Sequence, residues 1–530
     1  MHKDNFFDRE NYLDILEKRI RGLKEGYRQN IAIIGDELVG KTSLIFKFLD
    51  KFFDNNIIIL YLEVRPESVE TFTKRFIGTL LYNFLSNSAI PLKEEINFLF
   101  RKSQRYIPET TKKAQLILNA LEKKKRTNIL TELFSLCEMI NQETDKRCVV
   151  LLDEFHNLEN MGIKNMYREW SKLLITQKNT MYVITSSLKF KTKETLSKNL
   201  SLLFGNFQVI TVDPFDIKTS DDYLKYRLAG SNLASGLNNF VVNFSGGYPF
   251  YLKIIADALL SPKKQTLIDI LETLLFDTSG TLNQRFSNYL KRLLDLHHSQ
   301  DYLSILHSIS CGHNKIRDIA HIIRKTKKEL LPRISHLLEM DTITRSGDFL
   351  KINDRVFGFW LRFVYEGKSH SLTFDAKNQK EIFRANIEGM ISEFLQSSQK
   401  SIIERMTELL RLFEDDLVQI ERKRLRLNRF REIRTLDFTD TRLKQGLIGR
   451  SNDSLWIIAI KHDLLTEEDI TEFVRECKKY RHKLQRKIII ALQDIDTNAR
   501  LMALEEKIWM WDLNNLNRVL DLFSKPMVIA

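Results

Sequence analysis

Cysteine, proline and glycine are scarce in this chain, which contains 4 Cys, 8 Pro and 19 Gly among 530 residues. The cysteines are Cys137, Cys148, Cys311 and Cys477, and they lack the C-x-x-C spacing of zinc and redox sites. The sequence therefore predicts neither a zinc site nor a disulfide framework. Because 43% of the residues are hydrophobic and proline and glycine are few, a largely disordered chain is excluded and a globular, helix-rich protein is predicted.

Long hydrophobic runs are also lacking. No segment approaches the roughly 20 uncharged apolar residues that a membrane-spanning helix needs. The N-terminal sequence Met1-His2-Lys3-Asp4 is too polar for a signal peptide. We therefore expect a cytoplasmic protein that does not bind a membrane. A chain of this length exceeds what one hydrophobic core supports, so several domains are expected.

Acidic residues are outnumbered by basic ones, 69 to 82, which gives a formal net charge of +13. This excess favours a polyanionic partner, because lysine and arginine contacts release counterions from nucleic-acid phosphates. Basic residues cluster at 123–126, 324–328 and 421–434. Each run taken alone also fits a solvated helix face, and composition does not separate DNA from RNA.

A glycine-containing motif follows the first predicted strand. Residues 30–34 form a short β-branched segment, and Gly35-Asp36-Glu37-Leu38-Val39-Gly40-Lys41-Thr42 comes next with the pattern G-x-x-x-x-G-K-T. Residues 43–49 then show helical periodicity. The motif thus lies between a strand and a helix, which is the context that a P-loop requires.

The spacing of this motif suits a nucleoside triphosphate, with ATP as the expected nucleotide. Gly35 and Gly40 let backbone amides point at the phosphates, and the first helical turn, with Ser43, adds positive partial charge. Lys41 is predicted to contact the terminal phosphates, and Thr42 to ligate Mg²⁺.

Two further predicted strands end in polar residues. The strand at 148–152 is followed by Asp153, expected to hold Mg²⁺ through water, and by Glu154, expected to act as the general base for hydrolysis. The strand at 181–184 leads to Thr185 and Ser186. Resemblance to an AAA-like core implies that one of these two, with Thr185 as the first candidate, senses the γ-phosphate. With another strand at 57–64, the alternation of strands and helices predicts a three-layer parallel sheet.

Two segments carry a resemblance to a known family. Phe6-Phe7-Asp8-Arg9-Glu10 resembles the F-x-x-R-E entry segment of the archaeal-type ATPases, which belong to the STAND and AAA-related P-loop ATPases. Gly246-Gly247-Tyr248-Pro249-Phe250-Tyr251-Leu252 resembles the G-G-x-P-x-x-L lid motif of that family, and it also reads as a helix-breaking turn. The resemblance implies that Arg9 lies on the adenine side and that Pro249 belongs to a lid over the nucleotide.

The chain also departs from this family. It has Asn206 where the family often has an arginine, and the loss of that cation would remove a stabiliser of developing phosphate charge. The difference implies slow or partner-dependent turnover. Alternative cations are Arg168, Arg227 and Arg285.

Shorter predicted elements follow residue 301. Helices at 302–309, 316–324 and 327–339 and strands at 342–345 and 349–352 predict a winged helix, whose third helix is the candidate recognition helix. Its predicted DNA contacts are Lys327, Lys328 and Arg333. The aromatic segment 352–365 resembles the D-x-x-x-x-F-W-x-R-F signature of the same family, and its helical spacing indicates a packing ridge. Winged helices of STAND proteins also bind proteins, so a protein partner is an alternative.

The C-terminal region shows a strand at 454–461, a helix at 467–480 and a strand at 487–492, after a predicted helical stretch at 377–431. This order is similar to the restriction-endonuclease-like domain attached to many archaeal-type ATPases. The active form needs an Asp and then E-x-K. The chain keeps Lys461 but has Ala459 in place of the glutamate, and Gln445 and Gly446 near the expected aspartate. We interpret this region as a nuclease-like fold without nuclease activity.

Acidic residues displaced from the expected positions leave an active nuclease as an alternative. Asp437, Asp440 and Asp453 lie nearby without the family spacing, and Glu414 is interpreted as a solvated carboxylate.

The predicted fold class is α/β, with a P-loop ATPase core at 1–213, a helical lid at 214–300, a winged helix at 301–368, a helical connector at 369–433 and a nuclease-like domain at 434–530. The predicted function is an ATP-hydrolysing switch that uses Mg²⁺ and couples nucleotide state to binding of double-stranded DNA. A signalling or assembly scaffold with protein partners is the alternative, and a homo-oligomer is compatible with either.

Overall fold

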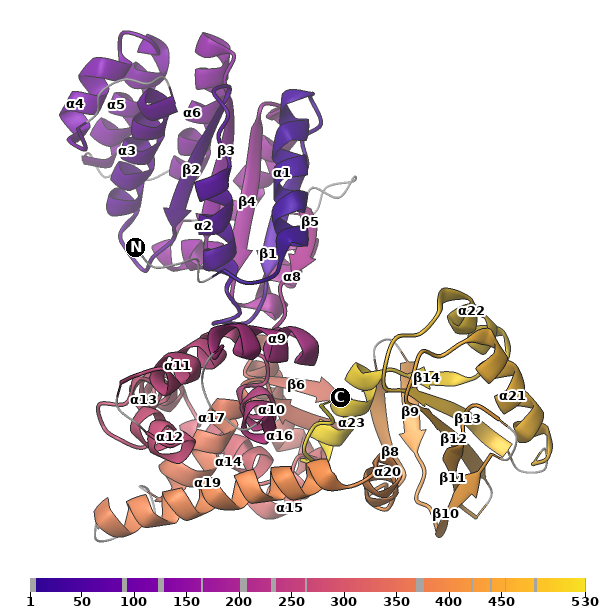
Figure 1. Cartoon of the computed structure of the whole chain (residues 1–530). Helices are drawn as coiled ribbons and strands as arrows, with labels where there is room; N and C mark the ends of the chain where they lie inside the picture. The colour runs from indigo at the N-terminus through magenta and orange to yellow at the C-terminus, as the bar shows by residue number, and fades with distance from the viewer. Residues whose placement is uncertain are drawn as a thin grey trace. The chain divides into compact units, whose positions relative to one another are not determined.

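The computed structural model describes residues 6–87, 93–122, 128–163, 165–200, 207–229, 235–262, 265–367, 376–420, 423–438, 441–452, 454–480 and 484–529. The chain divides into two compact units (Figure 1). The first comprises Met1–Pro214 with Glu339–Asp341, and the second comprises Phe215–Leu338 with Thr342–Ala530.

The first unit is built on a parallel sheet, which has five strands within the described residues. They are β1 (Asn30–Ile34), β2 (Ile57–Glu63), β3 (Arg147–Asp153), β4 (Thr180–Ser186) and β5 (Phe207–Thr211). Their order is β2-β3-β4-β1-β5, so β4 lies between β1 and β3 (Figure 1). The carboxyl ends of β1, β3 and β4 therefore meet at one edge of the sheet. This confirms the predicted α/β fold with a parallel sheet.

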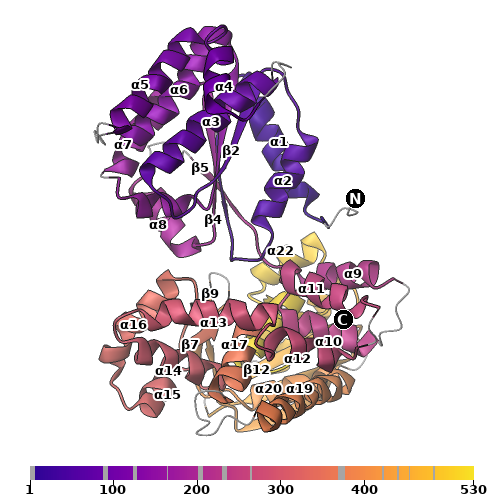
Figure 2. The ribbon, with the colours of Figure 1, turned by 90° about the vertical axis from the view of Figure 1, so that its left-hand side faces the viewer.

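Helices cover both faces of this sheet, which explains why β1 and β4 are buried along their whole length. On one face lie α1 (Glu10–Lys24) and α2 (Lys41–Lys51), as Figure 2 shows. The opposite face packs against α3 (Val69–Asn87), α4 (Ile96–Ser103), α5 (Pro108–Glu122), α6 (Ile129–Thr144) and α7 (Met166–Thr176). The short helix η1 (Phe155–Met161) follows β3, and α8 (Lys189–Lys198) follows β4. Fully buried Trp170 packs edge-on against Tyr182 at 5.3 Å between ring centroids.

The second unit begins with helices and a hairpin. The helices are α9 (Ile217–Arg227), α10 (Ser235–Ser245), α11 (Pro249–Leu259), α12 (Leu267–Leu275), α13 (Thr281–Leu294), α14 (Ser299–Ser310), α15 (Ile316–Ile323) and α16 (Lys327–Glu339). The antiparallel hairpin of β6 (Ile343–Ser346) and β7 (Phe349–Ile352) follows. Next come α17 (Arg355–Trp360), the π-helix η2 (Leu361–Tyr365) and α19 (Ala376–Gln399). The aromatic segment packs internally: Phe357 and Trp360 lie 5.4 and 5.8 Å from Phe286 between ring centroids.

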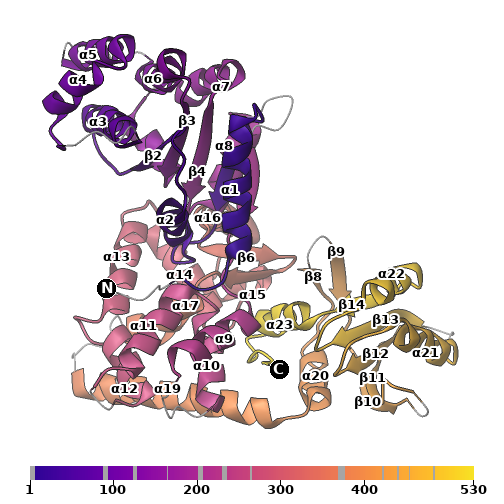
Figure 3. The same ribbon diagram turned by 45° about the horizontal axis from the view of Figure 1, so that its top comes forward.

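The C-terminal part of the second unit contains a mixed sheet (Figure 3). Strands β10 (Glu432–Asp437), β11 (Gln445–Arg450) and β12 (Leu455–Lys461) are antiparallel, and β13 (Leu484–Ala491) and β14 (Trp509–Trp511) continue the sheet in parallel with β12. One face packs against α21 (Glu467–Lys478) and α22 (Thr497–Glu505). The other face packs against α20 (Ile402–Leu410), α23 (Leu513–Leu522) and the hairpin of β8 (Asp416–Ile420) and β9 (Lys423–Leu427).

The predicted helical stretch at 377–431 is wrong beyond Leu410, where α20 ends and β8 and β9 begin. Side chains at alternate positions of this hairpin are buried, among them Val418, Leu425 and Leu427. A period of two fits a strand with one covered face, and the charged residues Arg424 and Arg426 lie at exposed positions between the buried ones. Among the described helices, none combines the length and apolar character needed to span a bilayer.

Candidate nucleotide site

Glycines shape the loop that joins β1 to α2. A Cβ atom on Gly35 would lie 2.2 Å from the carbonyl oxygen of Val212, far inside van der Waals contact. Gly40 caps α2 with a φ of +91°, a conformation that residues with a Cβ rarely adopt. Glycine is therefore required at both positions, at Gly35 by the close approach of the backbone and at Gly40 by the left-handed conformation.

Lys41 is the first residue of α2, and its side chain is only 4% exposed. Its ammonium group donates to the carbonyl oxygens of Gly35 and Asp36, each at 3.0 Å. It also donates to Ser187 Oγ at 3.0 Å and lies 3.8 Å from Glu154 Oε1. Burial lowers the pKa of Lys41, and the charge of Glu154 opposes this shift. Lys41 therefore joins the P-loop to the ends of β3 and β4.

Asp153 is a buried carboxylate, 2% exposed, that hydroxyl groups from three elements approach. Thr42 Oγ1 and the Tyr61 hydroxyl each donate to Oδ2 at 2.9 Å, and Thr185 Oγ1 donates to Oδ1. Burial and the neighbouring Asp153 raise the pKa of Tyr61. The hydroxyl of Thr42 and the carboxylate of Asp153 are oxygen donors of the kind that Mg²⁺ prefers, so these residues fit the predicted metal.

Glu154 follows β3 in a left-handed conformation, with φ of 53°. Its Oε2 accepts a 2.8 Å hydrogen bond from the backbone amide of Ser187, and its Oε1 accepts one from the Ser187 hydroxyl. His156 Nδ1 lies 3.3 Å from Glu154 Oε2 and 3.0 Å from Ser186 Oγ. Burial lowers the pKa of His156. The hydrogen bonds from Ser187 fix the orientation of the Glu154 carboxylate. Its side chain is 26% exposed, so the carboxylate is accessible to solvent.

Thr185 was the first candidate for sensing the γ-phosphate, yet the structure places it behind Asp153. It is fully buried, donates to Asp153 and accepts a 3.0 Å hydrogen bond from the backbone amide of Glu154. Ser187, one residue beyond the predicted pair, is the hydroxyl that contacts both Lys41 and Glu154. Ser187 was not predicted, since a run of hydroxyl residues at a strand end does not reveal which one faces the loop. Tyr61 was not predicted because it lies within β2, and spacing does not show that its hydroxyl reaches Asp153.

Arg9, at the start of α1, contacts the backbone of the P-loop. Its guanidinium is buried and donates to the carbonyl oxygen of Val39 in the loop, and to that of Asp213 at 2.9 Å. Burial lowers the pKa of Arg9. These contacts fix the loop backbone beside the end of β5. The predicted position of Arg9 on the adenine side stays a prediction.

Comparison with known proteins agrees with this geometry. Residues 6–254 match the family model described as an ATPase domain predominantly from Archaea. The chain contains an archaeal-type ATPase domain. No curated protein matches the sequence.

Solved structures that match this chain include a Walker-type ATPase of Pyrococcus abyssi, 21% identical, with a TM-score of 0.49 over 67% of this chain and 96% of that one. The ORC2 protein of Aeropyrum pernix is 10% identical, with a TM-score of 0.40 over 74% and 96%. The ORC1 protein of the same organism, in complex with DNA, is 12% identical, with a TM-score of 0.34 over 67% and 92%.

The G-G-x-P segment at the end of the ATPase domain forms the turn between α10 and α11. Gly246 and Gly247 have φ of +62° and +78°, and a Cβ on Gly247 would lie 2.1 Å from the carbonyl oxygen of Phe215. Pro249 is the first residue of α11. The turn therefore requires Gly246 and Gly247 on structural grounds. Contact of Pro249 with the nucleotide stays a prediction. So does contact of Ser43, which lies on the exposed side of α2. Asn206 lies outside the described residues, and Arg227 pairs with Asp257.

Beyond the ATPase domain, the predicted DNA contacts differ in exposure. Lys327 and Lys328 are exposed at the start of α16. Arg333 is half-buried, with Nε 3.4 Å from Asp301 Oδ2, and its contact with DNA stays a prediction. The turn of the β6–β7 hairpin is also occupied: the amide of Asp348 donates to the carbonyl oxygen of Leu417 at 2.9 Å. The tip of the predicted wing thus packs against β8.

In the described part of the C-terminal sheet, neutral residues occupy the positions where a nuclease of this kind has its acidic pair. Gly446 on β11 is paired with Ala459 on β12, so neutral residues face each other there. Lys461 Nζ donates to Asp469 Oδ1 at 2.9 Å, and both residues are buried. The one charged group kept from the nuclease motif is therefore used in an internal ion pair.

The displaced acidic residues do not restore a metal site among the described positions. Asp437 is exposed at the end of β10, whereas residues 440 and 453 lie outside the described ranges. The prediction that Glu414 is a solvated carboxylate agrees with its side chain, which is 56% exposed. This carboxylate also lies 3.0 Å from Lys315 Nζ and 2.6 Å from an Arg317 nitrogen. These cations lower its pKa, with Lys315 the larger influence.

Proposed function

We propose that the ATPase domain binds ATP with Mg²⁺ and hydrolyses it. The observation that carries this proposal is the convergence of four side chains at one edge of the sheet. Thr42 Oγ1 lies 2.9 Å from Asp153 Oδ2, and Lys41 Nζ lies 3.8 Å from Glu154 Oε1. These distances support the roles proposed here, in which Lys41 binds phosphate, Thr42 and Asp153 bind magnesium and Glu154 acts as the general base.

In this proposal each residue has a separate task. Lys41 exchanges its contacts with the loop carbonyls for oxygens of the terminal phosphates, beside the amides of the P-loop. Thr42 and Asp153 would hold Mg²⁺, and the bound ion would neutralise phosphate charge. Glu154 takes a proton from the attacking water, and Ser187 keeps its carboxylate directed at that water.

Phosphate release by the full chain tests this assignment. Glu154→Gln removes the base but keeps size and hydrogen bonding, so turnover falls by about 10²–10⁴-fold while ATP binding is retained. Equal phosphate release by wild type and Glu154→Gln, at equal ATP occupancy, would exclude this glutamate as the base.

We further propose that nucleotide state controls binding of double-stranded DNA, with Lys327 and Lys328 among the phosphate contacts. The net charge of +13 and the exposure of both lysines support this. Charge reversal at both positions should weaken DNA binding and reduce its salt dependence. Reversal of Lys112 and Lys113 on α5 is the charge-matched control.

The second candidate is an assembly scaffold that binds a protein or another copy of this chain. The hairpin tip favours it, because a wing that packs against β8 is not free to enter a groove of DNA. Partner binding that changes neither with salt concentration nor with charge reversal at Lys327 and Lys328 would support the scaffold function.

An active nuclease is the least favoured function, since Lys461 is paired with Asp469. Metal-dependent DNA cleavage that disappears in Lys461→Ala would nevertheless establish it.

A further inference from the structure

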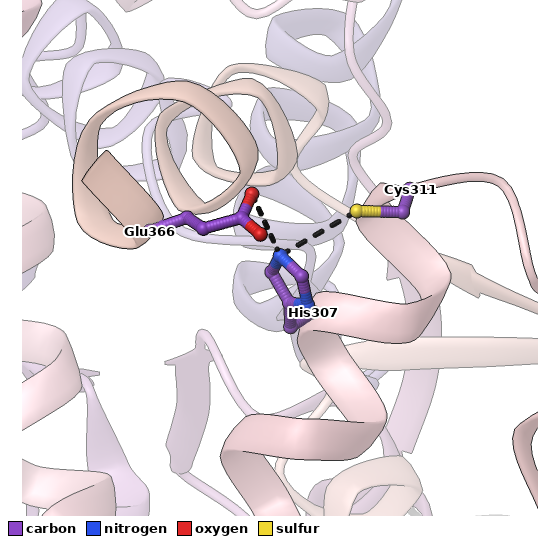
Figure 4. Close-up of side chains that lie close together, drawn as sticks. All are labelled: His307, Cys311 and Glu366. Atoms are coloured by element: carbon purple, nitrogen blue, oxygen red, sulfur yellow. Dashed lines mark hydrogen bonds and ion pairs between the residues drawn. The ribbon is translucent and has the colours of Figure 1, made fainter. Parts of the chain in front are cut away.

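Three side chains that nucleotide binding does not use meet in the second unit (Figure 4). His307 and Cys311 lie one helical turn apart, at the end of α14 and just beyond it, and Glu366 directly follows η2. His307 Nε2 lies 3.1 Å from Glu366 Oε2 and 3.5 Å from Cys311 Sγ. One ligand atom from each residue lies within 4.8 Å of the other two.

We propose that His307, Cys311 and Glu366 bind a divalent transition-metal ion, with Zn²⁺ the best match. Zinc bonds of about 2.0–2.1 Å to nitrogen and oxygen and about 2.3 Å to sulfur, at a tetrahedral angle, place neighbouring ligand atoms about 3.3–3.6 Å apart. The observed separations of 3.1 and 3.5 Å from His307 Nε2 are close to these values. The third pair, Cys311 Sγ and a Glu366 oxygen, lies within 4.8 Å, so side-chain shifts would bring all three atoms around one ion.

The arrangement is poorly explained as hydrogen bonding alone. The Glu366 oxygen and the Cys311 sulfur both approach the same nitrogen of His307, as Figure 4 shows. A ring nitrogen carries at most one proton and can make only one well-directed donor bond. A cation between the three atoms would satisfy a thiolate, a carboxylate and an imidazole lone pair together.

The ligand types also separate this site from the magnesium site of the ATPase domain. Thr42 and Asp153 offer oxygen atoms only, whereas a thiolate with an imidazole selects zinc or a similar ion. The side chains of His307 and Glu366 are 34% and 40% exposed. Three protein ligands at a half-exposed place leave a fourth position for water or an outside ligand.

The proposed metal would link the end of α14 to the residues that follow η2. These segments bound the region that contains α15, α16 and the β6–β7 hairpin. Spacing along the chain does not reveal this site, because the cysteines lack C-x-x-C spacing and Glu366 is far from the other two residues in the sequence.

Cobalt titration of the full chain tests the site, because Co²⁺ replaces Zn²⁺ and reports its ligands by absorption. We expect one equivalent to give visible bands of tetrahedral Co²⁺ and a near-ultraviolet thiolate-to-cobalt band, which Zn²⁺ abolishes. Cys311→Ser should remove the thiolate band. The oxygen ligands of the ATPase domain cannot produce this band, so failure here would leave the proposed ATPase function untouched.

Two further variants make the result independent of the serine substitution. His307→Gln and Glu366→Gln should lower the affinity for Zn²⁺, measured against a chromophoric chelator, by at least about tenfold. His313→Gln, a histidine in the loop after α14, is the matched control and should change nothing. Absence of the thiolate band at saturating Co²⁺, an equal band in Cys311→Ser, or equal Zn²⁺ affinity in His307→Gln would overturn the proposal.

Discussion

The backbone amide of Ser187 donates a 2.8 Å hydrogen bond to Glu154 Oε2, while the hydroxyl of the same serine donates to Oε1. Both oxygens of the proposed base are therefore held by one residue from the neighbouring strand end. Lys41 Nζ donates to that hydroxyl at 3.0 Å, which couples the base to the phosphate-binding cation.

Ser187→Ala should lower ATP turnover by about tenfold with little change in ATP affinity. The substitution removes one hydrogen bond to a charged group, worth about 1.5–3 kcal/mol, and about 1.4 kcal/mol corresponds to tenfold in rate. The backbone contact to Glu154 remains, so the loss is partial. Steady-state phosphate release measures the effect, with Ser187→Thr as the control that restores a hydroxyl. Wild-type turnover in Ser187→Ala would rule out this positioning role.

Gly35→Ala should destabilise the protein by about 1–3 kcal/mol, because its Cβ would lie 2.2 Å from the backbone oxygen of Val212. Gly78→Ala is the matched control. Gly78 lies within α3, with no atom within 4 Å of an added Cβ, so alanine there should be neutral or stabilising by up to about 1 kcal/mol. Chemical denaturation measures both variants. Similar free energies of unfolding would contradict the close approach at Gly35.

Much of this site was predictable because its parts are local in sequence. The strand, glycine loop and helix at 30–51 follow one another, and Asp153 and Glu154 directly end a hydrophobic strand. Ser187 and Tyr61 were not predictable in the same way. Their roles depend on which strands become neighbours and which hydroxyl faces the loop, and neither is encoded in spacing along the chain.

In the C-terminal region, some elements could be predicted from the sequence and others could not. The helix, the strands and their order around 455–491 follow from hydrophobic runs, whereas β8 and β9 are rich in charged residues and resemble a helical surface. Alternation in Asp416-Leu417-Val418-Gln419-Ile420 was the available signal, with Val418 and Ile420 buried. Five residues are too few for this period to outweigh the charged neighbours.

Burial lowers the pKa of His156 below its usual value of 6.5, so protonation costs more in the folded than in the unfolded protein. The stability that neutral His156 provides is complete above pH 6.5 and is lost as the pH falls through that value toward the folded pKa. His156→Gln cannot be protonated. Its Tm should therefore fall less than that of wild type between pH 7.5 and 5.5.

Thermal unfolding at the two pH values measures this difference, with exposed His321→Gln on α15 as the matched control. An equal fall in Tm for wild type and His156→Gln would show that this histidine does not contribute to acid sensitivity.

Arg9→Ala should weaken ATP binding and lower Tm, because the P-loop loses its contact at Val39 and the bond to Asp213. Arg21→Ala in α1 is the control, since Arg21 is 57% exposed and its ion pair with Glu17 lies at the surface. Titration calorimetry and thermal unfolding measure the two effects. Equal ATP affinity in Arg9→Ala, Arg21→Ala and wild type would show that the Arg9 contacts with the P-loop are not needed for ATP binding.

Magnesium-dependent ATP binding tests the central claim most directly. Titration calorimetry of the full chain should show ATP binding that weakens when Mg²⁺ is removed. Lys41→Ala should weaken binding by at least about 100-fold, which corresponds to about 2.8 kcal/mol. Lys51→Ala, at the exposed end of α2, should bind as wild type does. Absence of magnesium-dependent binding in the wild type, or equal affinity in Lys41→Ala, would contradict the account.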